Sequence, residues 1–124
     1  MKRVLIAVLI LATIITLGIL EQIFIKNTMN ALTDSLIELK TALLNGEDGI
    51  PENDNVLQVW ESKHRLFETL VPHNETKEIY IKISEIDGFI SGGDTENALS
   101  VTITLLDLIE YTAHLLYYLP EHIF

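Results

Sequence analysis

The sequence predicts an all-α protein, in which an N-terminal transmembrane helix continues into a stalk and packs with three further helices as an up-and-down antiparallel bundle. One reason is an uncharged apolar run, Val4–Leu20. Another is that apolar residues recur at spacings of three and four along the rest of the chain, as on one face of an α-helix. Short turns containing Gly or Pro separate these segments, and short turns favour antiparallel neighbours.

The apolar run is long enough to cross a membrane. Val4–Leu20 covers about 26 Å as a helix and about 33 Å if read on to Ile25, against a hydrocarbon core of roughly 30 Å. The alternative is a cleaved secretory signal, because Lys2 and Arg3 precede the run. The apolar part of a signal has only about 7–15 residues, so we favour an uncleaved anchor.

The basic residues predict how the anchor is oriented. Lys2 and Arg3 precede the span and only Lys26 follows it closely. The positive-inside rule therefore keeps the N-terminus in the cytoplasm and exports the remainder. We expect residues 1–26 to form a cytoplasmic tip and membrane anchor, and residues 27–124 to form an extracytoplasmic helical bundle.

Composition narrows the classes of function. The chain has no Cys, which excludes disulfides, thiolate nucleophiles and Cys-ligated metals. Of its 18 Asp and Glu residues only Glu21 precedes residue 27, so the expected ectodomain carries 17 acidic residues against five Lys and Arg. This excess of negative charge argues against binding to nucleic acid and against adhesion to anionic lipid.

The first two helices of the expected bundle span about 27–45 and 53–71. The apolar stripe of the stalk is Met29, Leu32, Leu36, Leu39 and Leu43, and Asn45-Gly46 predicts a left-handed C-cap. Asn53 or Asp54 is expected to cap the second helix. Pro72 ends that helix. Its expected core face is Val56, Trp60, Phe67 and Val71.

The last two helices span about 74–91 and 95–119. Asn74 is the expected cap of the third helix, whose apolar stripe is Ile79, Ile83, Ile86 and Ile90. Gly92-Gly93 ends this helix, Asp94 opens the next, and Pro120 follows its end. Of the 25 residues in 95–119, 15 are apolar and lie on more than one face. We therefore expect the fourth helix to be central or to offer a surface to a partner.

Two histidines stand near the corner between the second and third helices. His64 lies three residues after Glu61 and four before Glu68, a spacing that could hold a divalent metal, but we favour a solvated helix face and expect no metal. His73 is a candidate neutral ligand, acid-base group or pH sensor. The alternative, which we favour, is a ring that bonds to backbone and ties the two helices together.

A third candidate site lies on the last helix. Asp107, Tyr111, His114 and Tyr118 are four, three and four residues apart, which aligns them on one face and could form a polar groove for a small ligand. A boundary between core and water has a similar pattern, because Tyr and His often bury their bodies and keep their tips wet. We see no catalytic nucleophile, no cofactor motif and no phosphate-binding glycine loop in the sequence.

Nearly the whole chain resembles the Domain of Unknown Function 4363 family. The likeness rests on the basic start, the single N-terminal membrane helix, Trp60, the "VPHNE" corner, the isoleucine-spaced third helix, "GDTENAL" and the terminal "EHIF". It implies a small membrane-anchored helical protein of Firmicutes, mostly clostridia, and thus a place in a bacterial cytoplasmic membrane. Trp60, His73 and Ile123-Phe124 match features that recur in the family. The ending departs from the Asn-Ile-Leu common there, and the resemblance assigns no chemical role.

These observations favour a non-enzymatic extracytoplasmic module that binds another protein, most simply a neighbouring membrane protein or a second copy of itself. The alternative is a sensor or a small-ligand or metal-binding bundle that uses His73 or the Asp107, Tyr111 and His114 face. Neither interpretation requires a cofactor. An enzyme is the third choice, because the sequence does not place a nucleophile, a base and an orienting group together.

Overall fold

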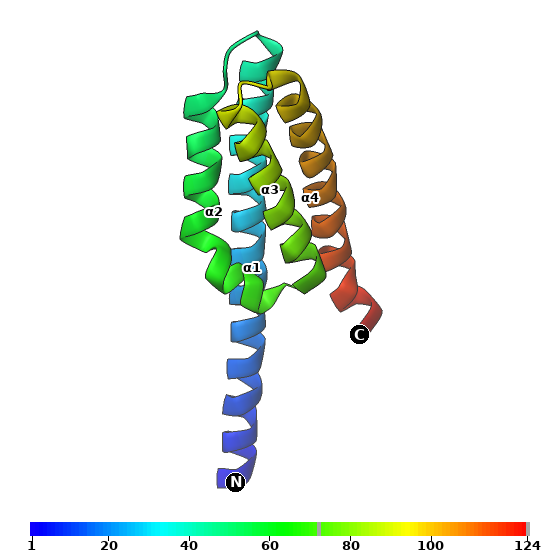
Figure 1. The fold of residues 1–124 in the computed structure, drawn as a ribbon. Helices are drawn as coiled ribbons and strands as arrows, with labels where there is room; N and C mark the ends of the chain where they lie inside the picture. Colours follow the sequence, from blue (N-terminus) through cyan, green and yellow to red (C-terminus); the bar gives the residue numbers. More distant parts are fainter. Residues whose placement is uncertain (72, 124) are drawn as a thin grey trace.

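Four helices are arranged as an up-and-down bundle in the computed structural model. It describes the backbone of residues 1–71 and 73–123 and the side chains of residues 1–71 and 74–114. The helices are α1 (Lys2–Leu44), α2 (Ile50–Leu70), α3 (His73–Ser91) and α4 (Thr95–Ile123). Neighbours in sequence run antiparallel (Figure 1). Since α1 and α3 each pack against both α2 and α4, the order around the bundle is α1, α2, α3, α4. The predicted all-α bundle is confirmed.

The first helix is much longer than the bundle. α1 has 43 residues without a break, and its N-terminal part projects beyond the other helices (Figure 1). Residues 1–23 are all exposed, and burial begins with Phe24 and Ile25. By length and composition the projecting segment is able to cross a membrane.

The apolar stripes predicted from the sequence form the core. All the predicted stripe positions of α1, α2 and α3 are buried, and they pack with Ala98, Leu105 and Ile109 of α4. Phe67, Ile79 and Leu36 are completely buried. The stripe positions are Met29, Leu32, Leu36, Leu39 and Leu43; Val56, Trp60, Phe67 and Val71; and Ile79, Ile83, Ile86 and Ile90.

Two of the predicted helix ends are confirmed in detail. At the end of α1, Gly46 has φ 82°, its N–H donates to the Leu43 carbonyl, and the Glu47 N–H donates to the Ala42 carbonyl. Gly93, after α3, has φ 75° and the same pair of bonds. This pattern is a Schellman motif, which satisfies carbonyls that the helix leaves free. Asp94 then caps α4, because its Oδ1 accepts from the Asn97 N–H at 3.1 Å.

The start of α2 differs from the prediction. The helix begins at Ile50, not at about residue 53, because Gly49 turns the chain with φ 74° and Asp48 Oδ1 accepts from the Ile50 N–H at 3.0 Å. Pro51 follows in the first turn, where its fixed φ suits a helix. Asn53 is therefore no cap. It is 2% exposed, and its Nδ2 donates to Asp87 Oδ1 of α3 at 2.9 Å.

Two other predicted helix limits need correction. α3 begins at His73, so Asn74 lies in its first turn and does not precede it. α4 runs to Ile123, past Pro120. A proline removes one backbone hydrogen bond and crowds the carbonyl four residues before it, and α4 continues for three residues after Pro120 in spite of both. Nor is α4 central, since it is one of four equivalent walls of the bundle.

Candidate functional site

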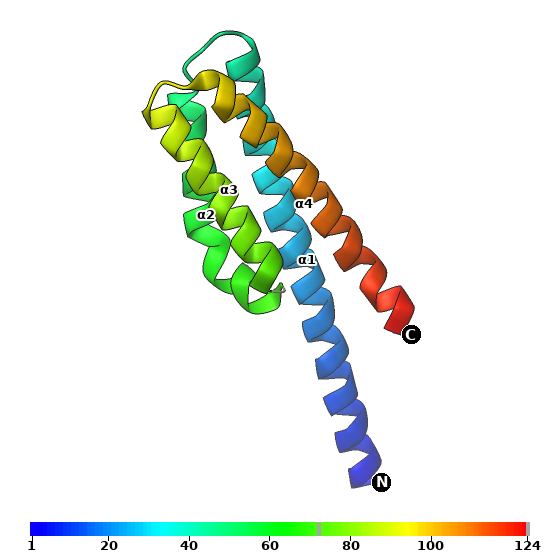
Figure 2. The ribbon, with the colours of Figure 1, turned by 45° about the vertical axis from the view of Figure 1, so that its right-hand side comes forward.

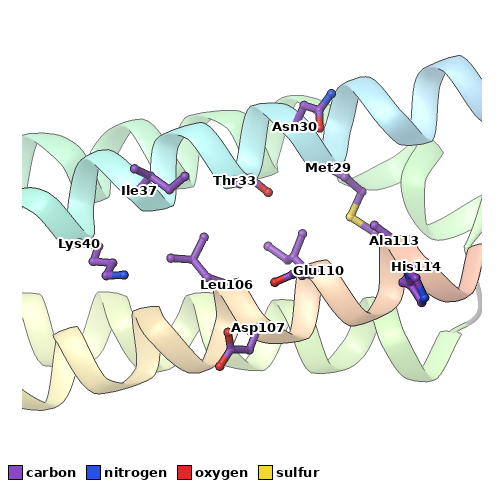
Figure 3. Close-up of a pocket in the computed structure, with 11 residues that line it drawn as sticks. Met29, Asn30, Thr33, Ile37, Lys40, Leu106, Asp107, Glu110, Ala113 and His114 are labelled. Carbon is purple, nitrogen blue, oxygen red and sulfur yellow. The ribbon is translucent and has the colours of Figure 1, made fainter.

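A groove with a volume of about 490 Å³ lies between α1 and α4. Figure 3 shows the two helices on either side of it, with Met29 directed at Ala113 and Leu106 directed at α1. The lining residues from α1 are Met29, Asn30, Thr33, Ile37 and Lys40, and those from α4 are Leu106, Asp107, Ile109, Glu110, Ala113 and His114.

Helix periodicity explains why the groove forms along this seam. Leu106, Glu110 and Ala113 recur at spacings of four and three, so they share one side of α4. The neighbouring positions Leu105 and Ile109 fill the core and are buried. On the groove side, Ala113 is short, and the space between the two helices stays partly open.

The floor of the groove is apolar and its rim is polar. Met29 and Ile109 are buried, whereas Ile37 is 47% exposed beside the opening. The rim carries Asp107 and Glu110 from α4 and Lys40 from α1. The ion pairs found in the described part of the chain, His64–Glu68 and Lys82–Glu85, involve none of these three residues. The rim charges are thus available to a molecule that enters the groove.

The groove brings together two of the predicted site residues. Asp107 and His114 both line it, and both are exposed. Tyr111 does not line it and is 63% exposed. In Figure 3 the carboxylate of Asp107 is turned away from α1, so Asp107 belongs to the outer lip. The side chain of Tyr118, the fourth member of the predicted row, lies outside the described residues.

Sequence reasoning missed the α1 side of the site. No motif or spacing in the sequence distinguishes Asn30, Thr33 and Lys40 from the other polar positions of the stalk. Only the pairing of α1 with α4 shows that these three residues line the groove. The available signal was the order of helices in an up-and-down bundle, which makes the first and last helices neighbours.

The corner histidine cannot be assigned a contact. His73 is the first residue of α3, but its side chain lies outside the described residues, so both of its predicted interpretations stay predictions. Thr76, one turn further on, is buried. The corner itself forms where Pro72 was expected to end α2.

His64 is placed among carboxylates, as expected, but also against the tryptophan. Its ring stacks on Trp60 with centroids 6.0 Å apart, and its Nδ1 lies 3.5 Å from Glu68 Oε1. The side chain is 33% exposed. Among the described residues, no group of three or more His, Asp or Glu is arranged to hold a metal ion.

Comparison of the chain with models of known protein families, with curated proteins and with solved structures found no match. The resemblance to the Domain of Unknown Function 4363 family therefore stays an expectation. Function is argued below from the groove, the anchor segment and the charge of the chain.

Proposed function

We propose that this chain is a single-pass membrane protein, without enzymatic activity, whose extracytoplasmic bundle docks a neighbouring membrane protein in the α1–α4 groove. The observation that carries the proposal is the groove itself, an apolar trough with a charged rim along the helix that forms the anchor. With N-terminal Lys2 and Arg3 held in the cytoplasm of a bacterium, the bundle faces outward.

The shape and chemistry of the groove suit a helix from the partner. Grooves between two helices commonly receive the apolar stripe of an amphipathic helix. Here Ile37 and Leu106 offer apolar contact at the opening, and Ile109 forms part of the floor. Asp107 and Glu110 on the α4 lip favour basic residues beside that stripe. The surplus of acidic residues in the ectodomain also favours a partner with basic residues, and it disfavours self-association.

Site-specific photocrosslinking in native membranes tests this proposal. Ile37 is exposed at the groove, so the full chain is made with p-benzoylphenylalanine at this position. We expect an adduct of one defined mass. The combined charge reversal Asp107→Lys and Glu110→Lys should remove this adduct, because it repels the basic flank of the docked helix.

Tyr80 provides the matched control. It is 54% exposed on α3, where it borders the hollow between α2 and α3, and it is already aromatic. The same photoreactive residue at Tyr80 should not give the adduct. Identical adducts from Ile37 and Tyr80, or an Ile37 adduct that survives the charge reversal, would show that the groove does not select the partner.

A small-ligand sensor is the second candidate. The observation in its favour is that the groove volume lies within the roughly 300–1,000 Å³ typical of ligand pockets and that Asp107, Glu110 and His114 all line it. A bound ligand raises the unfolding temperature by mass action. A screen of metal ions and metabolites against the full chain in detergent tests this, and a shift retained in Glu110→Gln would place the ligand elsewhere.

A further inference from the structure

We infer that the base of the bundle rests on the membrane and that a phospholipid surface is its partner. We define the base as residues 63–70 of α2 together with residues 115–123 of α4. This inference rests on the proposed anchor, and it adds a second contact with the bilayer, made by helices other than α1.

No spacer separates the anchor segment from the bundle. α1 is a continuous helix, Leu20 ends its uncharged run, and Phe24 and Ile25 are already packed against the bundle. Four residues of helix, from Leu20 to Phe24, rise only about 6 Å. A rigid helix cannot lift the bundle away, so its lower end must meet the bilayer surface.

The end of α2 reaches that surface. Lys63 lies beside Phe24, because its Nζ is 5.8 Å from the centroid of the Phe24 ring. From Lys63, α2 continues antiparallel to α1 for seven more residues, to Leu70, which is about 10 Å. Because Phe24 lies only about 6 Å from the end of the uncharged run, the end of α2 reaches about the level at which that run ends.

The residues that α2 brings to this depth include apolar ones. Lys63, Leu66 and Leu70 follow one another at spacings of three and four, so they share the face of α2 that meets Phe24. Leu66 is 50% exposed and Leu70 is half-buried. In water the exposed part of Leu66 has no apolar partner, whereas at a bilayer surface the acyl boundary covers it.

The end of α4 gives a second reason to infer a contact with the membrane. Both ribbon views show α4 running past the corner between α2 and α3, alongside α1 (Figures 1 and 2). The sequence of residues 115–119 is LLYYL. Leucine and tyrosine are residue types that membrane interfaces accommodate, and tyrosine is enriched there. The ends of two separate elements, α2 and α4, thus lie at the end of the bundle from which the anchor segment projects (Figures 1 and 2).

The contact is apolar and does not depend on charge. Across the base as defined, Lys63 and Arg65 are matched by Glu68 and Glu121, so it carries no net positive charge. The ectodomain as a whole is acidic, which disfavours adhesion to anionic lipid. We therefore identify the partner as the headgroup and upper acyl region of zwitterionic phospholipid.

Depth-dependent quenching in vesicles tests the inference. Because the chain has no Cys, a single Leu66→Cys substitution in the full chain can carry an environment-sensitive fluorophore. The chain is reconstituted into phosphatidylcholine vesicles containing lipids with a nitroxide near the headgroup. We expect the label to shift to shorter emission wavelength and to be quenched by the nitroxide. Thr69→Cys, also exposed on this part of α2, repeats the measurement at a second site.

Two reference sites make the outcomes distinguishable. Leu44→Cys is at a position 62% exposed at the opposite end of the bundle and should report water without quenching. Ile14→Cys, in the middle of the apolar run, should be quenched by nitroxides placed deep in the acyl chains. If Ile14 is quenched but Leu66 and Thr69 behave like Leu44, the inference about the base is overturned and the anchor stands. If Ile14 is not quenched, the anchor fails and the inference fails with it.

Discussion

At the scale of single residues, two independent features of the structure require glycine at position 49, as Gly49 shows. Its φ of 74° lies in the left-handed region, and a Cβ built on it would stand 2.9 Å from Leu39 Cδ1 and 3.0 Å from Leu43 Cδ2. Both leucines are buried and must move to admit a methyl group. The loop between α1 and α2 therefore packs directly against the core.

Gly49→Ala should destabilise the protein more than Gly46→Ala. Gly46 has a similar φ of 82°, but a Cβ added to it would meet no atom within 4 Å, so its substitution adds only the backbone strain, about 1–2 kcal/mol. Gly49→Ala adds overpacking of about 1–3 kcal/mol. Thermal unfolding of the full chain in detergent, followed by circular dichroism, gives the order. Equal unfolding temperatures would contradict this order and would mean that Leu39 and Leu43 move to admit the methyl group without loss of stability.

Two buried threonines on α4 are expected to respond differently to replacement by valine. Thr102 Oγ1 donates to the Ala98 carbonyl at 2.7 Å, whereas Thr112 Oγ1 is buried without a hydrogen-bond partner among the described residues. Thr112→Val removes an unsatisfied hydroxyl and should stabilise by about 1 kcal/mol. Thr102→Val should be neutral or destabilising. Urea midpoints of the two variants check this, and a loss of stability in Thr112→Val contradicts it.

At the scale of elements, the join between α2 and α3 includes a polar contact. Asn53 is buried and donates to Asp87, a hydrogen bond to a charged group. Asn53→Ala removes that bond, which is worth about 1.5–3 kcal/mol, but it also removes Asn53 Oδ1, which is buried without a partner among the described residues, so we expect a net loss below that range. Asn55→Ala, at an exposed position of the same helix, is the control and should change little. Comparable losses in both variants, measured as urea midpoints, would point to helix propensity alone.

The sequence alone predicts the parts of this fold that depend on interactions between residues close in the chain. The spacing of Leu32, Leu36 and Leu39, or of Ile79, Ile83 and Ile86, identifies the core face, because residues three and four apart share one side of a helix. Asn45-Gly46 and Gly92-Gly93 mark helix ends for an equally local reason, the left-handed conformation that a glycine adopts without strain.

These local rules do not predict contacts between helices. Asn53 looks like a cap in the sequence because Asn is a good capping residue, and only the distance to Asp87 on another helix reveals its buried role. Likewise, the spacing of Asp107, Tyr111 and His114 puts them on one face, yet Tyr111 lies outside the groove, whose edge depends on where α1 sits. Half of this site comes from α1, which the pattern on α4 cannot specify.

At the scale of the whole molecule, the bundle should fold without the projecting segment. Residues 1–23 are exposed throughout and bury nothing against the other helices. We expect a fragment of residues 24–124 to be a helical, cooperatively unfolding domain in water, because it keeps the complete core. Circular dichroism melts and dispersed amide NMR signals check this. A fragment with helical content but no cooperative transition would show that α1 needs its N-terminal half to hold the bundle.

The unbroken course of α1 fixes more than the height of the bundle. An α-helix turns by about 100° per residue, so the direction in which the groove faces within the plane of the membrane is set by the number of residues between the anchor and Phe24. One residue inserted there would raise the bundle by about 1.5 Å but turn its groove through more than a quarter of a circle. The length of this short stretch thus determines which protein beside the anchor the groove can face.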